Sequence, residues 1–339
     1  MADQTTFHAA CHCKASKLSF TIPTSSLPLP THFCHCSICR RTHGTLCTIH
    51  SPIPAPTVDL STLTAYASSS EVVRYFCSTC GGHLFDNANR KGKEESWCVS
   101  TSLVDASEET WDFHSHICLE GSGDGGAVVW VPEIGGKKVA MWKMKPTDEA
   151  EFKDTGDWKP PSSPPTAARS TSEKLTARCH CGGVELHIAR PRDSEIWSQV
   201  PVRQTPHDKT KWLGSVETCN SCRLVSGCSI VCWVFPLQSH ITLADGSPYT
   251  PVFGTAKMYK SSEGVTRTFC GRCGAMCTYA CEEQMGTVDV AAGLLVGEGA
   301  RAEEWIDWRT GEVVWGEDCE WKGLLTGLEE GLKKYGEAL

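Results

Sequence analysis

A cluster of three cysteines near the start of the chain has the residue types and the spacing of a metal site. Cys34, Cys36 and Cys39 fall within six residues, at C-x-C-x-x-C spacing. Thiols this close together are poorly suited to separate disulfides and well suited to a single metal ion. Three thiolates leave a tetrahedral zinc ion with one open position, which is the arrangement of catalytic zinc sites. We therefore predict that this cluster is the reactive centre of the protein.

Two further cysteine pairs in the same half predict a second metal ion. Cys11 and Cys13 form a C-x-C pair, and because residues i and i+2 of an extended strand point to the same face, we expect their thiols to converge along a strand. Cys77 and Cys80 form a C-x-x-C pair that two glycines follow. Four thiolates close the coordination shell of zinc, so we expect a structural ion here. The alternatives are one cluster of all seven cysteines or an iron–sulfur centre. Iron–sulfur ligation usually uses a different run of cysteines, which favours zinc.

The same order of motifs restarts in the second half, with different loop lengths. A complete second four-thiolate set is present, namely Cys179, Cys181, Cys270 and Cys273. Repetition of motifs in one order over this distance indicates a tandem duplication. The chain is therefore expected to hold two copies of one zinc-binding unit.

The reactive cluster is not repeated in full. Cys219 and Cys222 match Cys36 and Cys39, but Glu217 stands where the first half has Cys34. Two thiolates and a carboxylate make a weaker and harder ligand set, unless Cys228 or Cys232 replaces the lost thiol. We expect this second site to be empty or vestigial, and the second half to be structural, a lid or a dimerisation surface.

Polar residues flank the first cluster. His35 lies between two of its cysteines, where it either donates to a substrate or a sulfur, or faces solvent. Arg40 and Arg41 follow the cluster and would hold an anionic substrate, offset thiolate charge, or form an ordinary surface pair. The other cysteines are interpreted as small buried apolar groups; they are Cys47, Cys98, Cys118, Cys228, Cys232, Cys277, Cys281 and Cys319.

Composition limits the class of protein. The chain has 339 residues, a formal net charge of −8, 40% apolar residues and 21 cysteines, which suits a globular protein of about two domains. Neither half has a basic block, so we expect no nucleic-acid partner. No apolar run approaches the roughly 20 residues that span a bilayer, and the polar N-terminus has no signal pattern. We therefore expect a cytoplasmic protein, and in a reducing compartment clustered cysteines favour metal binding over disulfides.

The elements that would position these residues are mostly strands. Alternating or β-branched runs predict them at residues 18–22, 46–49, 72–76, 83–85, 97–100 and 127–131. A proline- and serine-rich linker is expected at 145–174, between a first domain at 1–144 and a second at 175–339. Leucines at helical spacing over 323–339 predict one amphipathic helix, packed on the second domain.

These motifs resemble those of a known family. C-x-C, then C-H-C-x-x-C-R with a following glycine, then F-C-x-x-C-G, is similar to the glutathione-dependent formaldehyde-activating enzymes, a family that also includes centromere protein V. The resemblance implies a mainly β fold of two tandem zinc-binding β-tent domains, built from small antiparallel sheets. It also implies that Cys11, Cys13, Cys77 and Cys80 hold a structural zinc, and that Cys34, Cys36 and Cys39 hold a catalytic one.

The function implied by the resemblance is carbon–sulfur lyase chemistry, the interconversion of S-(hydroxymethyl)glutathione with glutathione and formaldehyde. With the second reactive site altered, about three zinc ions per chain are expected. Two alternatives remain, a non-catalytic zinc-stabilised binding or scaffold module and a tailoring enzyme acting on another small molecule. The basic, proline-rich extension of the centromere-protein branch is not found in this chain, which argues against a chromatin role.

Overall fold

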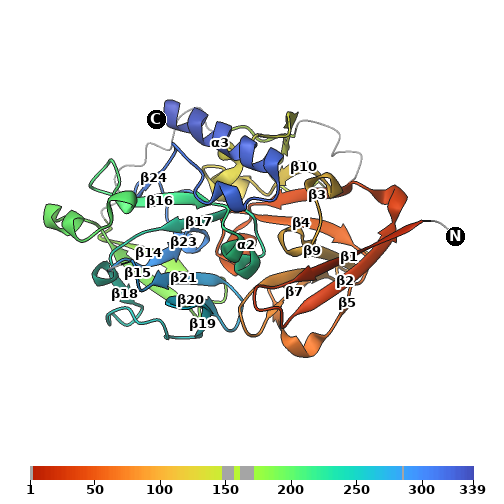
Figure 1. Ribbon diagram of the computed structural model, residues 1–339, viewed down its shortest axis with the longest axis horizontal. Coiled ribbons are helices and arrows are strands. Elements are labelled where there is room, and N and C mark those ends of the chain that lie inside the picture. Colours follow the sequence, from red (N-terminus) through yellow and green to blue (C-terminus); the bar gives the residue numbers. More distant parts are fainter. Residues whose placement is uncertain (1–2, 147–155, 161–171, 285) are drawn as a thin grey trace.

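Two β-rich halves lie side by side in the computed structural model, which describes residues 3–146, 156–160, 172–284 and 286–339 (Figure 1). Over these residues the chain forms three α-helices and many short strands. One apolar cluster of buried side chains runs through both halves without a break. The mainly β class that the sequence predicts is confirmed.

The first half consists of a small sheet, a large sheet and a two-stranded hairpin. The small sheet has the strand order β1-β2-β5, and the large sheet has the order β13-β10-β3-β4-β9-β8-β7-β6. Their bounds are β1 Gln4–Ala10, β2 Lys17–Pro23, β3 Leu29–Cys34, β4 Thr48–Ile53, β5 Thr57–Val58, β6 Leu63–Ala67, β7 Val72–Cys77, β8 His83–Ala88, β9 Ser96–Ser100, β10 Trp111–Ile117 and β13 Ala140–Met141. Because β3 and β10 pair in parallel, their carboxyl ends meet at one edge of the sheet.

The second half repeats this plan. Its sheets have the orders β18-β15-β14-β23 and β19-β20-β21-β22-β17-β16-β24. Their bounds are β14 Lys174–Arg178, β15 Glu185–Ala189, β16 Trp212–Glu217, β17 Val231–Val234, β18 Ile241–Leu243, β19 Ala256–Ser262, β20 Val265–Cys270, β21 Met276–Cys281, β22 Asp289–Ala291, β23 Leu295–Val296 and β24 Ile306–Trp308. Read across the sheet, the order β19-β20-β21-β22-β17-β16-β24 matches the order β6-β7-β8-β9-β4-β3-β10 strand for strand. The last two strands, β16 and β24, pair in parallel as β3 and β10 do. The tandem duplication is thus visible in the topology, although the two large sheets are mixed rather than purely antiparallel.

A short helix follows the cysteine motif in each half. Helix α1 (Ser37–His43) has Cys36 at its N-cap, and α2 (Asn220–Ser226) has Cys219 there. Each helix ends at a glycine with positive φ, +82° at Gly44 and +75° at Gly227, because a left-handed residue ends a helix at little cost only when it lacks a side chain.

Two local predictions were wrong. The run 127–131, expected as a strand, lies mostly in the 3₁₀-helix η6 (Gly126–Trp130), because Gly125 and Gly126 turn the backbone to positive φ directly before it. Cys11 and Cys13 were expected to converge along a strand. They lie in the turn after β1, which ends at Ala10, and it is this turn that brings their thiols together.

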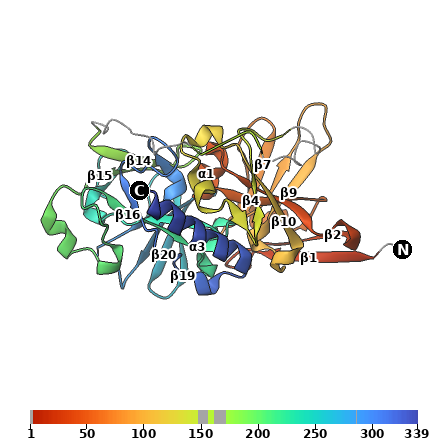
Figure 2. The same ribbon diagram turned by 90° about the horizontal axis from the view of Figure 1, so that it is seen from above.

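The amphipathic C-terminal helix is present as α3 (Lys322–Glu337), and it packs on both halves rather than on the second half alone. In the first half it contacts η6 and the hairpin strand β11 (Glu133–Ile134), which pairs with β12 (Lys137–Lys138). In the second half, the hydroxyl of Tyr335 donates to Glu303, and its ring lies against the guanidinium of Arg301. The carboxylate of Glu108 accepts hydrogen bonds from the first backbone N–H groups of the helix. Figure 2 shows α3 crossing over the junction of the two halves.

The halves meet through contacts that occur in symmetric pairs. His12 hydrogen-bonds Tyr259 at 2.7 Å, and the matching His180 hydrogen-bonds Tyr66 at 2.7 Å. The backbone N–H of His12 donates to Leu224 and that of His180 donates to Arg41. The duplicated units therefore dock as a pseudo-symmetric pair within one chain.

The expected linker lies largely outside the described residues. The described piece 156–160 packs on the first half, where Trp158 donates its backbone N–H to Met141. Within the part of the chain that the structure covers, no helix is both long and apolar enough to cross a membrane.

Candidate metal centre

The two predicted four-thiol sets are each assembled. The sulfurs of Cys11, Cys13, Cys77 and Cys80 lie within 4.8 Å of one another, and so do those of Cys179, Cys181, Cys270 and Cys273. Adjacent sulfurs such as Cys11 and Cys13 are 3.5 Å apart. That separation is far longer than a disulfide and close to the roughly 3.8 Å edge of a tetrahedral zinc–thiolate site. The donor sets therefore fit zinc in both halves.

Cys34, Cys36 and Cys39 also converge within 4.8 Å. Strand β3 ends at Cys34, Cys36 caps α1, and Cys39 lies in the first helical turn. The backbone N–H of Cys39 donates to the sulfur of Cys36 at 3.3 Å, which holds the two thiols on one side of the turn. Cys34 and Cys39 are buried and Cys36 is half-buried, so the cluster is open on one side. The set fits a zinc ion held by three thiolates.

A buried arginine that the sequence analysis missed contacts this cluster. Arg74 on β7 donates to the sulfur of Cys39 at 3.3 Å and forms a 2.8 Å ion pair with Asp86. Burial favours a lower pKa for Arg74, but Asp86 and the Cys39 sulfur outweigh it and raise that pKa. Arg74 therefore stays charged and offsets thiolate charge. Its match in the second half, Arg267, donates to Cys222, so comparison of the two F-C-x-x-C segments would have found both arginines.

Arg40 and Arg41, which the sequence analysis singled out, differ from Arg74 in their burial and their partners. Arg40 is buried, and its Nε and one terminal nitrogen have no hydrogen-bond partner among the described residues. Burial lowers its pKa, with Arg41 next in effect. Arg41 is half-buried, so Arg40 and Arg41 are not an ordinary pair of surface residues. The unpartnered N–H groups of Arg40 can hold an anion.

His35 does not face solvent. It is fully buried, and its Nε2 lies 2.9 Å from Nδ1 of His116, whose Nε2 lies 2.8 Å from the carbonyl of Val131. The carbonyl can only accept, so His116 donates to it and His35 donates to His116. Burial lowers the pKa of His116 to about 4 and that of His35 well below its usual value, so both rings are neutral.

A fourth thiol lies beside the cluster. Cys118 directly follows β10, whose last residue Ile117 is paired with Cys34, and its side chain packs against the cluster of Cys34 and Cys39. Cys118 is half-buried and has a positive φ of +60°. It was expected to be a small buried apolar group. The site therefore offers three convergent sulfurs and a fourth at its edge.

The matching site of the second half lacks both outer thiols. Glu217 replaces Cys34, and Trp315 replaces Cys118, since Val314 pairs with Glu217 as Ile117 pairs with Cys34. Trp315 keeps the positive φ, at +59°. Among the described residues, the groups of three or more convergent donors do not include Glu217 with Cys219 and Cys222. Cys228 and Cys232 are buried in the apolar core instead.

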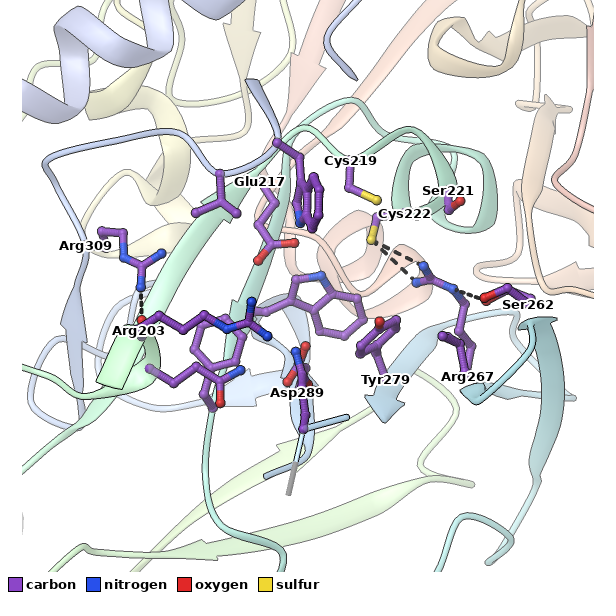
Figure 3. Close-up of a pocket in the computed structure, with 18 residues that line it drawn as sticks. Arg203, Glu217, Cys219, Ser221, Cys222, Ser262, Arg267, Tyr279, Asp289 and Arg309 are labelled. Carbon is purple, nitrogen blue, oxygen red and sulfur yellow. Dashed lines mark hydrogen bonds between the residues drawn. The ribbon is translucent and has the colours of Figure 1, made fainter. Parts of the chain in front are cut away.

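A cavity of about 240 Å³ occupies that second site, lined by Glu217, Cys219, Cys222, Arg267 and Asp289 among others (Figure 3). Burial raises the pKa of Glu217 to about 8. The hydrogen bond with Cys222 lowers the pKa of Cys219 to about 7. The second half thus has a pocket where the first half has a sulfur cluster.

Comparison with known proteins gives the family. Three fungal relatives, provisionally named glutathione-dependent formaldehyde-activating enzymes, include one from Talaromyces marneffei that is 32% identical over 85 residues and one from Emericella nidulans that is 32% identical over 79. These matches cover 24% and 22% of this chain and 44% and 39% of the relatives, so the matched stretch spans less than half the length of either.

A solved structure of a Rhodobacter sphaeroides protein overlaps 40% of this chain and 99% of its own, at 16% identity and a TM-score of 0.26, and carries no weight here. The family model for the glutathione-dependent formaldehyde-activating enzyme matches residues 6–120 and 204–308, one region in each half. The chain therefore belongs to the family of glutathione-dependent formaldehyde-activating enzymes, as two tandem copies.

Proposed function

We propose that the protein is a zinc-dependent carbon–sulfur lyase that forms or cleaves a thiol–aldehyde adduct such as S-(hydroxymethyl)glutathione. The observation that carries the proposal is the convergence of Cys34, Cys36 and Cys39 within 4.8 Å, in a half-open cluster beside a charged arginine. Zinc bound there would supply a Lewis acid for an aldehyde oxygen or would lower the pKa of a substrate thiol. We propose three zinc ions per chain, two structural and one reactive.

The residues around the cluster have separate roles in this proposal. Arg74 balances the charge of the thiolates and holds Cys39 in place. Arg40 binds a substrate carboxylate through its unpartnered N–H groups. In the cleavage direction the carbon–sulfur bond breaks, the sulfur keeps the electron pair, and the hydroxyl proton passes to the released thiolate. The products are a thiol and formaldehyde, and no oxidant is needed.

The experiment is exchange spectroscopy by NMR on mixtures of glutathione and formaldehyde, with zinc counted on the same samples. We expect Cys36→Ser to lower the exchange rate by at least about a hundredfold and to reduce zinc from three ions to two, while the fold is kept. Cys98→Ser, on β9, is the matched control for thiol loss. A Cys36→Ser protein with full exchange activity would refute the lyase proposal.

Cys118 favours a second candidate function. If its sulfur completes the shell of the reactive zinc, the site is closed and the protein is a zinc-stabilised binding module. This candidate expects three tightly bound zinc ions and no acceleration of the exchange by the wild-type protein. The lyase proposal expects acceleration, so the wild-type measurement alone separates the two.

A further inference from the structure

The cavity of the second half lies where the first half has its reactive cluster, and it retains two of the sulfurs. Glu217 and Trp315 have replaced the two outer thiols, so the donor set that would hold a metal is dismantled while the C-x-x-C pair survives. At about 240 Å³ the cavity is smaller than the roughly 300–1,000 Å³ of drug-sized sites. It suits a molecule of the size of an amino acid or a short peptide.

The two sulfurs are arranged as an attacking and a resolving thiol. Cys219 is half-buried on the cavity wall, whereas Cys222 lies fully inside, and Figure 3 shows their sulfurs next to each other. Arg267 donates to the sulfur of Cys222 at 3.5 and 3.6 Å, which fixes the inner thiol. A dithiol that is reachable from one side and has no third convergent metal donor among the described residues is free to form a disulfide.

The opposite wall carries groups that recognise the rest of a ligand. Arg203 extends toward the space between Glu217 and Asp289 (Figure 3), and in the described structure its guanidinium has no ion pair or hydrogen bond. Asp289 is only 4% exposed, and its Oδ1 has no hydrogen-bond partner among the described residues. The guanidinium of Arg203 can bind a carboxylate, and Oδ1 of Asp289 can accept a hydrogen bond from an N–H group. Such a pair of contacts matches an amino-acid or peptide ligand.

We propose that this cavity is a metal-free thiol–disulfide exchange site for small disulfides that carry a free carboxylate and an amine, of the cystine type. The sulfur of Cys219 attacks the substrate disulfide, forms a mixed disulfide and releases one half as a thiolate, which takes the proton of Cys222. The sulfur of Cys222 then attacks the sulfur of Cys219 and releases the second half as a thiolate, which takes up the proton that Cys219 lost when it attacked. One substrate disulfide becomes two thiols, and the protein dithiol is oxidised to a disulfide.

The test uses the full-length, zinc-replete protein with cystine and, as a matched probe without carboxylates, cystamine. Trypsin releases residues 212–223 as one peptide that holds both Cys219 and Cys222, separate from the peptide 18–40 that holds the reactive cluster. After alkylation, mass spectrometry should show a disulfide within peptide 212–223 with cystine. In Cys222→Ser, a mixed disulfide should remain trapped on Cys219.

Arg203→Gln tests the substrate class. We expect it to slow oxidation by cystine about tenfold, and to leave oxidation by cystamine unchanged, because only cystine carries the carboxylate. Equal slowing with both probes would overturn the assignment of the carboxylate contact. Two other results would overturn the exchange site itself: a peptide 212–223 that keeps both thiols free, or the loss of one zinc ion in Cys219→Ser. None of these results depends on the lyase activity of the first half.

Discussion

At the scale of the residue, the most informative position is Cys118. Trp315 occupies the same place in the second copy with the same left-handed backbone, +59° against +60°. The unusual φ therefore belongs to the architecture of the parallel strand pair and was not introduced for the sulfur. What the first copy adds is a thiol, placed beside the cluster of Cys34 and Cys39 by a turn that exists without it.

Replacing Cys118 by glycine separates the sulfur from the backbone. A left-handed residue with a side chain costs about 1–2 kcal/mol, and the added freedom of unfolded glycine offsets part of that gain. We expect Cys118→Gly to raise the free energy of unfolding by about 0.5–1 kcal/mol and to keep three zinc ions, measured by denaturation and metal analysis.

Trp315→Gly is the control, because it relieves the same backbone without removing a thiol. A fall to two zinc ions in Cys118→Gly alone would mean that the fourth sulfur is a required ligand. That result would support the closed, non-catalytic site.

At the scale of the element, α1 and β8 bury neutral histidines against each other. The ring of His83 stacks on that of His43 with centroids 4.0 Å apart. Burial, followed by the charge of Arg74, lowers the pKa of His83 to about 3. The folded pKa lies below the unfolded value, so the stability due to His83 is present above about pH 6.5 and is lost as the pH falls toward 3.

The second copy supplies the natural substitution, since Met276 matches His83. The free energy of unfolding should fall less steeply in acid for His83→Met, because the variant takes up about one proton fewer on unfolding. Between pH 6.5 and pH 4 this difference amounts to roughly 3 kcal/mol. Urea denaturation at a series of pH values measures the slope. Parallel curves for variant and wild type would show that His83 takes up no proton on unfolding.

At the scale of the whole molecule, the two copies share an interface that leaves no room for added atoms. A Cβ on Gly44 would lie 2.2 Å from the carbonyl oxygen of Met276, and one on Gly227 would lie 2.6 Å from that of His83. The ends of α1 and α2 therefore touch the opposite copy by symmetry.

Gly44→Ala should destabilise the protein by roughly 3 kcal/mol, from a left-handed alanine and a clash across the interface. Gly92→Ala is the control, because Gly92 has a φ of +77° but nothing within 4 Å of the added atom, and we expect it to cost about 1 kcal/mol. Thermal unfolding measures both. If both variants lost the same amount of stability, the interface between the two copies would accommodate the added methyl group at no cost in free energy.

Much of this architecture was predictable because its signals are local. Each thiol set is made from C-x-C and C-x-x-C pairs whose spacing survives in the sequence, and the order of the motifs revealed the duplication. Cys118 was missed because the pairing of β3 with β10, separated by a long stretch of chain, places it beside Cys34. The run 127–131 was misassigned because β-branched residues and tryptophan favour a strand, whereas the two glycines before it decide the turn.

The C-terminal helix has a consequence for how the protein is made. Its leucines predicted a buried face packed on the second half, whereas α3 also covers Trp130 of the first half. During synthesis the half with the reactive cluster leaves the ribosome long before residues 322–337 exist. Until then the side of Trp130 that packs on Tyr335 has no cover, so a stop codon late in the reading frame would leave an apolar surface of the amino-terminal copy exposed.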